Sequence, residues 1–386
     1  PEGSANDWRQ WRGPLASGAA ASTANPPVEW SETNNLRWKV RIPGAGTSTP
    51  IIVADKIFLL TAVEEGAAAE KGKAPAGDKG KKGGQGGFGR SPKPTAKVDF
   101  NVVCLDRKTG ATVWTKTLKS EVPHEGHHRD HGFASFSPVT DGSRLYVLYG
   151  SRGLYCLDLA GDVKWTKELG RMETRNGFGE GSSPALHENT LVINWDHEGA
   201  DFVAAFDKRT GDELWRQPRD EPTSWTTPVI CGISGKMQVV IPGTKRCRAY
   251  DLATGKELWD APGLTTNVIP SGIADGEMVY LTSGFRGAEF LAIRLGKTGD
   301  LTKTDAIVWK HSKETPYVPS PMLSNGKLYF FKGNEGVLSS LDAATGKPAM
   351  AATRVPGLGS VYASPVAVGK ELYLRGRNSL YCIAAP

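Results

Sequence analysis

Four of the seven histidines fall within eight residues, at His124, His127, His128 and His131. Imidazole nitrogens and carboxylate oxygens are ligands that Zn and Cu prefer in proteins, and Ca takes oxygen ligands. His124, His128 and His131 are therefore candidate ligands for Zn or Cu, and Ca, held by oxygen ligands, is the third candidate ion. A loop can also hold adjacent histidines fully solvated. Arg129 within the cluster and the lack of a helical His-Glu-x-x-His pattern argue against a metal, and both interpretations stay open.

A second group that could do chemistry is the run Asp196, His197 and Glu198. Asp196 and Glu198 could act as a general acid and base, and Asp196 with His197 could add to a metal site. Carboxylates two residues apart in a loop also commonly form turns. The sequence contains no Ser nucleophile elbow, no phosphate-binding loop and no dinucleotide-binding fingerprint. These three residues are the candidate catalytic residues, with a turn as the alternative.

The elements that position these loops come from an internal repeat. Four turns of the form Asp-x-x-Thr-Gly are followed by a large apolar residue four positions after the Gly, and a shorter copy keeps that offset. They occupy 106–114, 207–215, 251–259, 342–350 and 158–165. A looser copy around Thr298-Gly299 and Trp309 carries six extra residues. Asp bonds the backbone of a tight turn, Gly supplies its positive φ, and the flanks alternate, so each copy predicts a β-hairpin.

A second recurring motif, a Ser or Thr followed in all but one copy by Pro, stands upstream of each hairpin. We call each copy of this dipeptide a mark. The marks are Thr49-Pro50, Ser137-Pro138, Ser183-Pro184, Thr227-Pro228, Ser271-Gly272, Ser320-Pro321 and Ser364-Pro365. Most neighbouring marks are 44–49 residues apart; the first interval is 88 residues. Each mark opens a unit of four short strands, A to D. Four strands in about 40–50 residues are typical of a β-propeller blade.

The chain ends predict how the ring closes. The last unit has strands near 364–368, 371–375 and 379–383 and no fourth strand, whereas 36–40 forms a strand that precedes the first mark. We therefore predict an all-β, seven-bladed β-propeller with four-stranded blades, in which 36–40 completes the last blade beside 381–383. Such closure leaves no open sheet edge. Eight blades would need a further unit inside the 88-residue interval.

That long interval holds a Gly/Lys-rich segment, 64–98, without apolar periodicity, which predicts a loop inserted between strands B and C of blade 1. It carries eight Lys/Arg against four Asp/Glu, or +4 of the chain's +6. The rest is near neutral, so the charge does not indicate nucleic-acid binding. The segment could tether an anionic partner or be a tolerated surface insertion.

Residues 36–386 are expected to form one domain, preceded by an extended arm over 1–35. Trp8, Trp11 and Trp30 are expected to hold this arm across outer strands. No apolar run reaches the about 20 residues that a membrane span needs. The chain starts with Pro rather than Met, which suits a mature periplasmic or secreted protein whose signal peptide has been removed. We expect a monomer.

The five cysteines do not form a redox or metal motif. Cys104, Cys156 and Cys382 occupy the same place in three repeats, so they are expected in separate blades as small buried hydrophobic residues. Cys231 and Cys247 fall in one blade, and a disulfide between them is conceivable.

Strand direction sorts the loops onto two faces. The uniform Asp-Thr-Gly turns share one face, whereas the irregular D-to-A and B-to-C loops share the other, where function is expected. Residues just before each mark should rim the central channel and form a small-molecule or anion site. The candidate ligand-binding residues are Glu180, Trp225, Asn267, Arg286, Tyr317 and Tyr362.

The repeat resembles the pyrroloquinoline quinone-like (PQQ-like) β-propeller repeat family. The resemblance rests on the Asp-x-x-Thr-Gly copies and on 137–142, 154–158 and 318–321. The segments 8–13, 194–199 and 224–228 resemble an exported planctomycete-type branch. The motif identifies the fold but says little about function, because its residues are those that form the blades.

The resemblance implies two kinds of protein. Quinoprotein dehydrogenases hold the quinone against a Trp, with a Ca ion, an Asp base and often vicinal cysteines; Trp225 and Asp196 could fill two of these roles, but no vicinal pair exists and PQQ is not expected. The lipoprotein propeller of the outer-membrane β-barrel assembly machine is a non-catalytic adaptor. We expect an exported scaffold that binds a protein partner or a small polar or anionic ligand. Alternatives are a PQQ-dependent alcohol or sugar dehydrogenase and a metal-assisted hydrolase or lyase on polysaccharides.

Overall fold

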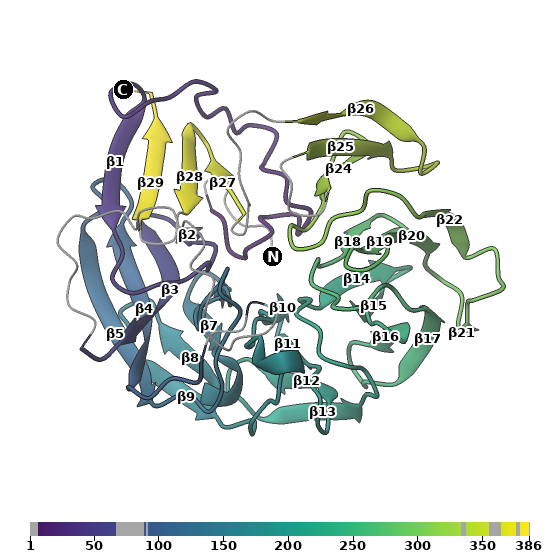
Figure 1. Cartoon of the computed structure of the whole chain (residues 1–386), viewed down its shortest axis with the longest axis horizontal. Coiled ribbons are helices and arrows are strands. Elements are labelled where there is room, and N and C mark those ends of the chain that lie inside the picture. Colours follow the sequence, from purple (N-terminus) through teal and green to yellow (C-terminus); the bar gives the residue numbers. More distant parts are fainter. Residues whose placement is uncertain are drawn as a thin grey trace.

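The computed structural model describes residues 7–66, 89, 92–332, 337–354, 364–375 and 379–385. Seven antiparallel sheets surround a central axis, so the protein is the predicted seven-bladed β-propeller (Figure 1). Apart from the single residue Gly89, helix in the described part consists of two 3-10 turns, η2 (Gly150–Arg152) and η3 (Arg175–Gly177). None of the described helices could therefore span a bilayer.

The blades follow the chain, each running from an inner strand A to an outer strand D. Blades 1 to 3 are β2 (Ile51–Val53), β3 (Lys56–Glu64), β4 (Val98–Asp106) and β5 (Thr112–Glu121); β6 (Val139–Thr140), β7 (Arg144–Leu148), β8 (Leu154–Asp158) and β9 (Val163–Lys167); and β10 (Ala185–His187), β11 (Thr190–Trp195), β12 (Phe202–Asp207) and β13 (Glu213–Pro218). Blades 4 and 5 are β14 (Val229–Ile233), β15 (Lys236–Ile241), β16 (Arg246–Asp251) and β17 (Glu257–Pro262); and β18 (Ile273–Asp275), β19 (Met278–Ser283), β20 (Glu289–Arg294) and β22 (Ile307–His311). Blades 6 and 7 are β23 (Met322–Ser324), β24 (Lys327–Lys332), β25 (Val337–Asp342) and β26 (Pro348–Arg354); and β27 (Val366–Val368), β28 (Glu371–Arg375), β29 (Ser379–Ala384) and β1 (Leu36–Arg41).

The ring closes as predicted. Strand β1 pairs antiparallel with β29, and Trp38 lies opposite Cys382. Blade 7 therefore takes its outer strand from the start of the domain and its inner three from the end (Figure 1). The looser repeat has a structural use. The turn glycine and the residue after it form β21 (Gly299–Asp300), which adds in parallel to β17 and gives blade 4 a fifth strand.

Neighbouring blades are joined by the tryptophans of the outer strands. The Trp215 indole N–H donates to the carbonyl of Leu252 in the next blade at 2.9 Å, and its ring lies over Gly255. Trp38, Trp114, Trp165 and Trp309 make the same bond to Arg107, Leu159, Lys208 and Ala343. The repeated offset from Gly to Trp in the sequence thus reflects a contact between one blade's Trp and the next blade's Gly.

A second set of links runs around the inner strands through the Ser and Thr of the marks. The backbone N–H of Ser137 donates to the hydroxyl of Ser183 at 2.9 Å, and Ser183 N–H donates to Thr227 at 3.2 Å. Further links of this kind run from Thr49 to Ser137, Thr227 to Ser271, Ser271 to Ser320 and Ser364 to Thr49. We call these hydroxyl-bearing residues the hydroxyl ring.

The hydrophobic core lies between adjacent sheets. Phe58 and Cys104 of blade 1 belong to one buried cluster with Tyr146 and Cys156 of blade 2. All five cysteines are buried and free, which confirms the expected role of Cys104, Cys156 and Cys382 as small hydrophobic residues. Cys231 and Cys247 form no disulfide.

Candidate functional site

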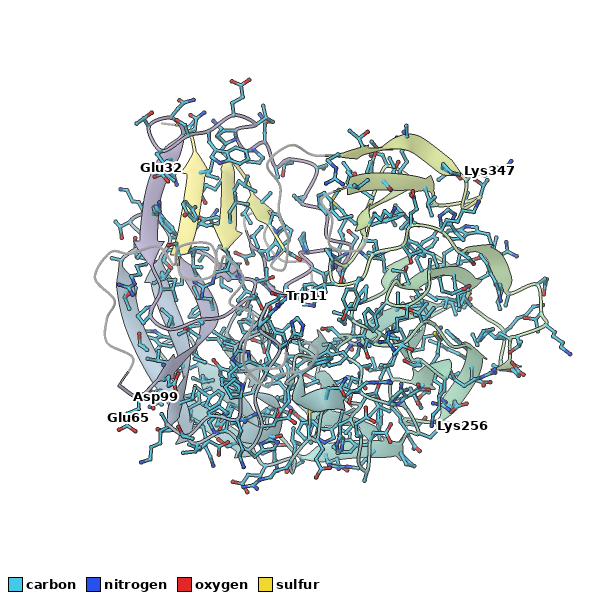
Figure 2. The ribbon with its side chains drawn as sticks, viewed as in Figure 1. Trp11, Glu32, Glu65, Asp99, Lys256 and Lys347 are labelled. Atoms are coloured by element: carbon cyan, nitrogen blue, oxygen red, sulfur yellow. The ribbon has the colours of Figure 1, made fainter. Side chains whose placement is uncertain are left out.

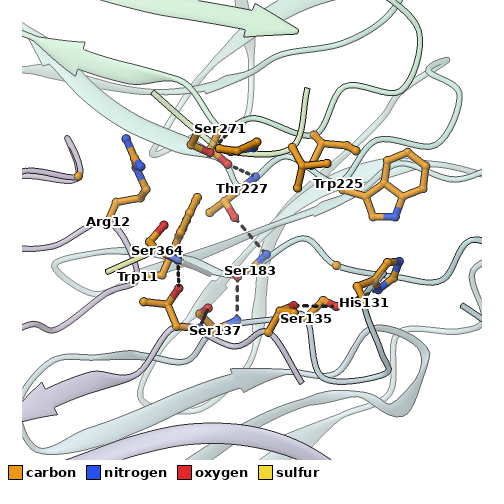
Figure 3. Close-up of a pocket in the computed structure, with 18 of the residues that line it drawn as sticks. Trp11, Arg12, His131, Ser135, Ser137, Ser183, Trp225, Thr227, Ser271 and Ser364 are labelled. Carbon is orange, nitrogen blue, oxygen red and sulfur yellow. Dashed lines mark hydrogen bonds between the residues drawn. The ribbon is translucent and has the colours of Figure 1, made fainter. Parts of the chain in front are cut away.

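A cavity of about 460 Å³ lies on the axis of the ring, within the range of small-molecule sites. The hydroxyl ring and the inner strands form its wall, and aromatic side chains line both ends (Figure 3). These aromatic residues are Trp8, Trp11, Phe178, Trp225, Tyr317, Tyr329, Phe330 and Phe331. We call this space the central cavity.

The N-terminal arm forms one end of the central cavity, so the expectation that its tryptophans lie across outer strands is wrong. Trp8 is buried and pairs with Ile52 of the innermost strand β2, with backbone N···O distances of 2.8 and 2.9 Å. Trp11 lies at the centre of the ring (Figure 2). Trp30 is 46% exposed and does not hold the arm.

Hydrogen bonds tie this arm to the face that carries the A-to-B turns. Asp7 accepts from Ala54 N–H at 3.0 Å, the carbonyl of Arg9 accepts from Thr140 N–H at 3.0 Å, and Asn25 N–H donates to Gly369 at 2.7 Å. These partners lie at inner turns of blades 1, 2 and 7. The arm thus crosses the channel at its turn face, whereas the cavity's other end lies among the D-to-A loops.

Arg12 is a buried cation in the cavity wall. Its guanidinium donates to the carbonyl of Ser17 at 3.1 Å and to that of Pro321. Its Nε is buried and has no hydrogen-bond partner, and no described carboxylate forms an ion pair with it. Burial lowers the pKa of Arg12 to about 9, so the side chain remains charged at neutral pH.

The predicted ligand-binding residues separate into two groups. Trp225 and Tyr317 line the central cavity, and Trp225 is fixed by a 2.6 Å bond from its indole N–H to the carbonyl of Gly179. Glu180, Asn267 and Arg286 are not part of the lining. Tyr362 lies outside the described residues. Sequence reasoning missed Trp11 and Arg12, whose only signal was the close spacing of aromatic and cationic residues before the first strand.

The three residues outside the lining have other partners. Glu180 is buried and accepts from Ser151 N–H at 2.6 Å and from Arg152 at 2.8 Å. Asn267 is buried with a left-handed backbone (φ 58°). The guanidinium of Arg286 lies 5.4 Å from the ring centre of Phe285, which stacks on Tyr317 at 4.8 Å. Arg286 therefore supports a wall residue indirectly.

The histidine cluster also divides. His128 and His131 line the central cavity, with stacked rings 6.3 Å apart, whereas His124 lies with Glu125 and Glu180. The ligand atoms of that second group lie within 4.8 Å of one another.

The donors of this second group already have protein partners. Glu125 accepts from the hydroxyl of Thr174 at 2.7 Å, Nε2 of His124 lies 2.7 Å from the carbonyl of Met172, and the cation of Arg152 bonds Glu180. A divalent cation would have to displace these bonds beside a buried positive charge, so the donor set does not fit a metal. The three predicted ligands are thus not brought to one point.

His131 gives a prediction for pH dependence. Burial, followed by the neighbouring His127, lowers the pKa of His131 to about 4 from its usual value near 6.5. Between these values the unfolded chain binds a proton that the folded chain does not, so stability falls as the pH drops from 6.5 to 4. Because one pKa unit corresponds to about 1.4 kcal/mol, we expect His131→Asn to remove up to about 3 kcal/mol of this loss. Urea denaturation across the range measures it; an unchanged slope in the variant would contradict the assignment.

The candidate catalytic residues are engaged in holding loops. Asp196 is fully buried and forms an ion pair with Arg219 at 2.6 Å, and the Ser224 hydroxyl donates to it at 2.6 Å. Glu198 accepts from the hydroxyl of Thr223 at 2.8 Å. Nδ1 of His197 accepts from the backbone N–H of Glu173 and of Gly199, both at 3.1 Å. Asp196, His197 and Glu198 are absent from the lining of the central cavity.

The central cavity also offers few of the oxygen ligands that a quinone with its calcium ion would need. In the described wall of the central cavity the carboxylate is that of Asp130, which lies in the His128–His131 segment and is 40% exposed. Calcium requires several oxygen ligands, usually with more than one carboxylate. The residues present therefore do not fit a calcium-bound quinone.

Comparison with known proteins gives the family. The family model described as outer membrane protein assembly factor BamB matches residues 98–268 and 163–385. The outer membrane protein assembly factor BamB of Burkholderia pseudomallei (strain K96243) is 26% identical over 259 residues, covering 65% of this chain and 60% of that protein. The match thus spans less than two thirds of that relative's length.

Two solved structures share the fold. A quinohemoprotein alcohol dehydrogenase from Comamonas testosteroni has a TM-score of 0.54 and 14% identity, covering 98% of this chain and 80% of that one. A quinohemoprotein alcohol dehydrogenase of Pseudomonas putida HK5 has a TM-score of 0.50 and 11% identity over the same shares. At such identities the likeness concerns the fold alone. Because the family model covers well over half of the sequence, the chain belongs to the PQQ-like β-propeller repeat family that the BamB model describes.

Proposed function

We propose that this chain is a non-catalytic binding propeller that presents its D-to-A and B-to-C loops, here the loop face, to a protein partner. The proposal rests on one observation: acidic side chains in these loops form ion pairs and hydrogen bonds with neighbouring loops and so hold them in place. Asp196 joins the loop after β11 to Arg219 after β13, and Glu221 accepts from the N–H groups of Lys245 and Arg246 at 2.8 and 2.9 Å. Rigid loops of this kind bind with little loss of conformational entropy.

The proposal extends to the cellular setting. The curated relative is named an outer membrane protein assembly factor, and we propose a corresponding role for this chain: an exported scaffold, periplasmic or secreted, that contacts proteins destined for or resident in an outer membrane. The opening segment 8–13 and the segment 194–199 support the exported planctomycete-type branch.

Site-specific photo-crosslinking in the native host tests the proposal. A photoreactive amino acid replaces Arg129 or Lys245 on the loop face, whose side chains are 75% and 57% exposed. Matched controls replace Lys256 and Lys347, which are exposed and follow the glycines of the repeated turns on the opposite face; both lie at the outer rim of the ring (Figure 2). We expect adducts of one defined mass from the loop face only. Equal adducts from both faces, or none from either, would rule the proposal out.

A further inference from the structure

The joint between blades 6 and 7 differs from the other joints of the ring in its core. One buried hydrophobic cluster joins blades 1, 2 and 3, and four further clusters join blades 3 and 4, 4 and 5, 5 and 6, and 7 and 1. Among the described residues, no buried cluster of this kind joins blades 6 and 7. We call this joint the seam.

The seam also lacks the two links that recur around the ring. Met350 of the outer strand β26 stands where the outer strands of most other blades carry a Trp that bonds the next blade. The hydroxyl ring runs from Ser271 to Ser320 and resumes from Ser364 to Thr49. Ser320 and Ser364 both belong to the described residues, and no hydrogen bond joins them. Blades 6 and 7 are therefore held together less firmly than the other neighbours.

One face of blade 6 is consequently left partly exposed. Leu328 and Phe330 are 0% and 3% exposed, in the cluster shared with blade 5. Because side chains alternate along a strand, Tyr329 and Phe331 point the other way, toward blade 7, and both are only half-buried. Met322, which lies opposite Tyr329 in the sheet, is 37% exposed. The same sheet is thus packed on the side of blade 5 and open on the side of the seam.

The N-terminal arm is bonded to blade 6 at the edge of this open face. The carbonyl of Ser17 accepts from the backbone N–H of Leu323 at 3.1 Å, and the guanidinium of Arg12 donates to the carbonyl of Pro321. The two arm residues are held close to each other by the turn at Gly18, where φ is 82° and a Cβ would lie 2.9 Å from Nη2 of Arg12. The arm therefore contacts blade 6 through a defined local structure.

The same arm is fixed to the blades on the other side of the seam. The backbone N–H of Asn25 donates to the carbonyl of Gly369 in blade 7 at 2.7 Å, and the backbone of Trp8 pairs with Ile52 of blade 1. Figure 1 shows the arm, in purple, passing between β27 of blade 7 and β24 of blade 6. The arm is thus attached to both sides of the seam. Hydrogen bonds of this kind have a modest net strength, because water replaces them when they break.

We propose that the N-terminal arm acts as a releasable strap, which holds blade 6 to blades 7 and 1, and that its release opens the ring at the seam and exposes the apolar face of blade 6. The strap is distinct from the pairing of β1 with β29, which completes blade 7 and does not cross the seam. This inference goes beyond the proposed function, because it concerns a movement of the ring and does not depend on what the loop face binds.

Electron–electron resonance distances between spin labels on the full chain measure the opening. The seam pair replaces Lys327 and Lys370, which are exposed at or beside the A-to-B turns of blades 6 and 7. The control pair replaces Asn189 and Lys236, which are exposed at the equivalent turns of blades 3 and 4. Labels attach to the introduced cysteines because the five native cysteines are buried.

The strap is released by combining Trp8→Ala with Arg12→Ala, since these residues hold the arm to blade 1 and to blade 6. We expect the seam pair to move apart by about 5 Å, half the usual spacing of about 10 Å between packed sheets, and the control pair to keep its distance. Trp30→Ala is the matched variant in the same arm, because Trp30 is 46% exposed and lies outside these contacts. It should change neither distance.

Hydrogen exchange on the native chain gives a second test that needs no variant. The amides of Leu323 and Asn25 are engaged by the strap, whereas those of Ser183 and Thr227 form links at closed joints. Local opening at the seam should make the two strap amides exchange at similar rates, at least about 10-fold faster than the two link amides. If the double variant does not fold, this comparison decides.

The proposal is overturned if the seam pair keeps its native distance in the double variant, or if the control pair widens as much as the seam pair. Equal widening of the seam in Trp30→Ala would also overturn it, because that change leaves the strap attached. On the native chain, exchange of Leu323 as slow as that of Ser183 would show that the seam stays closed, and would overturn the proposal as well.

Discussion

Asp196→Ala is expected to lower the free energy of unfolding by about 3–5 kcal/mol, the usual cost of removing one partner from a buried ion pair. Asp196 and Arg219 have no exposed side-chain surface and are joined at 2.6 Å. The carboxylate also accepts from Ser224, and Arg219 donates to the Tyr250 hydroxyl at 2.9 Å. Without Asp196 the guanidinium stays buried and uncompensated. Chemical denaturation of the purified chain measures the change.

Asp220→Ala is the matched control. Its carboxylate lies one residue from Arg219 and pairs with Arg248 at 2.6 Å, but it is 63% exposed. An exposed ion pair contributes little, so we expect a loss of at most about 1 kcal/mol. A second variant, Asp196→Leu with Arg219→Met, removes both charges at once and should recover much of the stability, because no charge remains uncompensated.

This pair of variants bears directly on the catalytic hypothesis. If Asp196 is a brace, the double variant restores stability and loop-face crosslinking together. If Asp196→Ala leaves stability unchanged, the carboxylate does not hold the loops, and its role as an acid or base regains support. We favour the structural role, in which Asp196 holds the loops together, because a fully buried, ion-paired carboxylate has no access to a substrate.

The fold was predictable because it repeats. Each Asp-Thr-Gly-Trp copy encodes a contact that recurs between blades, so its spacing carries three-dimensional information. Trp38 opposite Cys382 follows from counting strands. From the sequence, the Ser-Pro and Thr-Pro marks could be used only to delimit the repeat units. In the structure their hydroxyls also link the inner strands around the channel, and this role cannot be seen in a single unit.

The site was less predictable, because it depends on segments without periodicity. The arm reaches the channel through bonds to blades far away in sequence, such as that from Leu323 N–H to the carbonyl of Ser17. His124 and His131 are close in sequence, yet His124 lies near Glu180 and His131 lines the cavity. Local spacing cannot indicate which neighbouring blade supplies a loop residue's partner.

The second large effect concerns the glycine of the repeated turn. Gly255 has φ 73°, and a Cβ there would lie 2.6 Å from two ring atoms of Trp215. We expect Gly255→Ala to cost about 3 kcal/mol, since it combines left-handed strain with displacement of a packed indole. Gly235, in the same blade, has φ 78°, and a Cβ there would meet no atom within 4 Å, so Gly235→Ala should cost only about 1–2 kcal/mol of strain.

Since backbone strain is common to both glycine variants, their difference in unfolding free energy measures the contact between Trp215 and the next blade. Trp215→Ala supplies the independent check, because combining it with Gly255→Ala should cost less than the sum of the single changes. Equal losses at Gly255 and Gly235, or strict additivity with Trp215→Ala, would mean that the offset between Gly and Trp reflects turn geometry alone. A clearly larger loss of unfolding free energy for Gly255→Ala than for Gly235→Ala would instead show that the offset between Gly and Trp reflects the contact between adjacent blades.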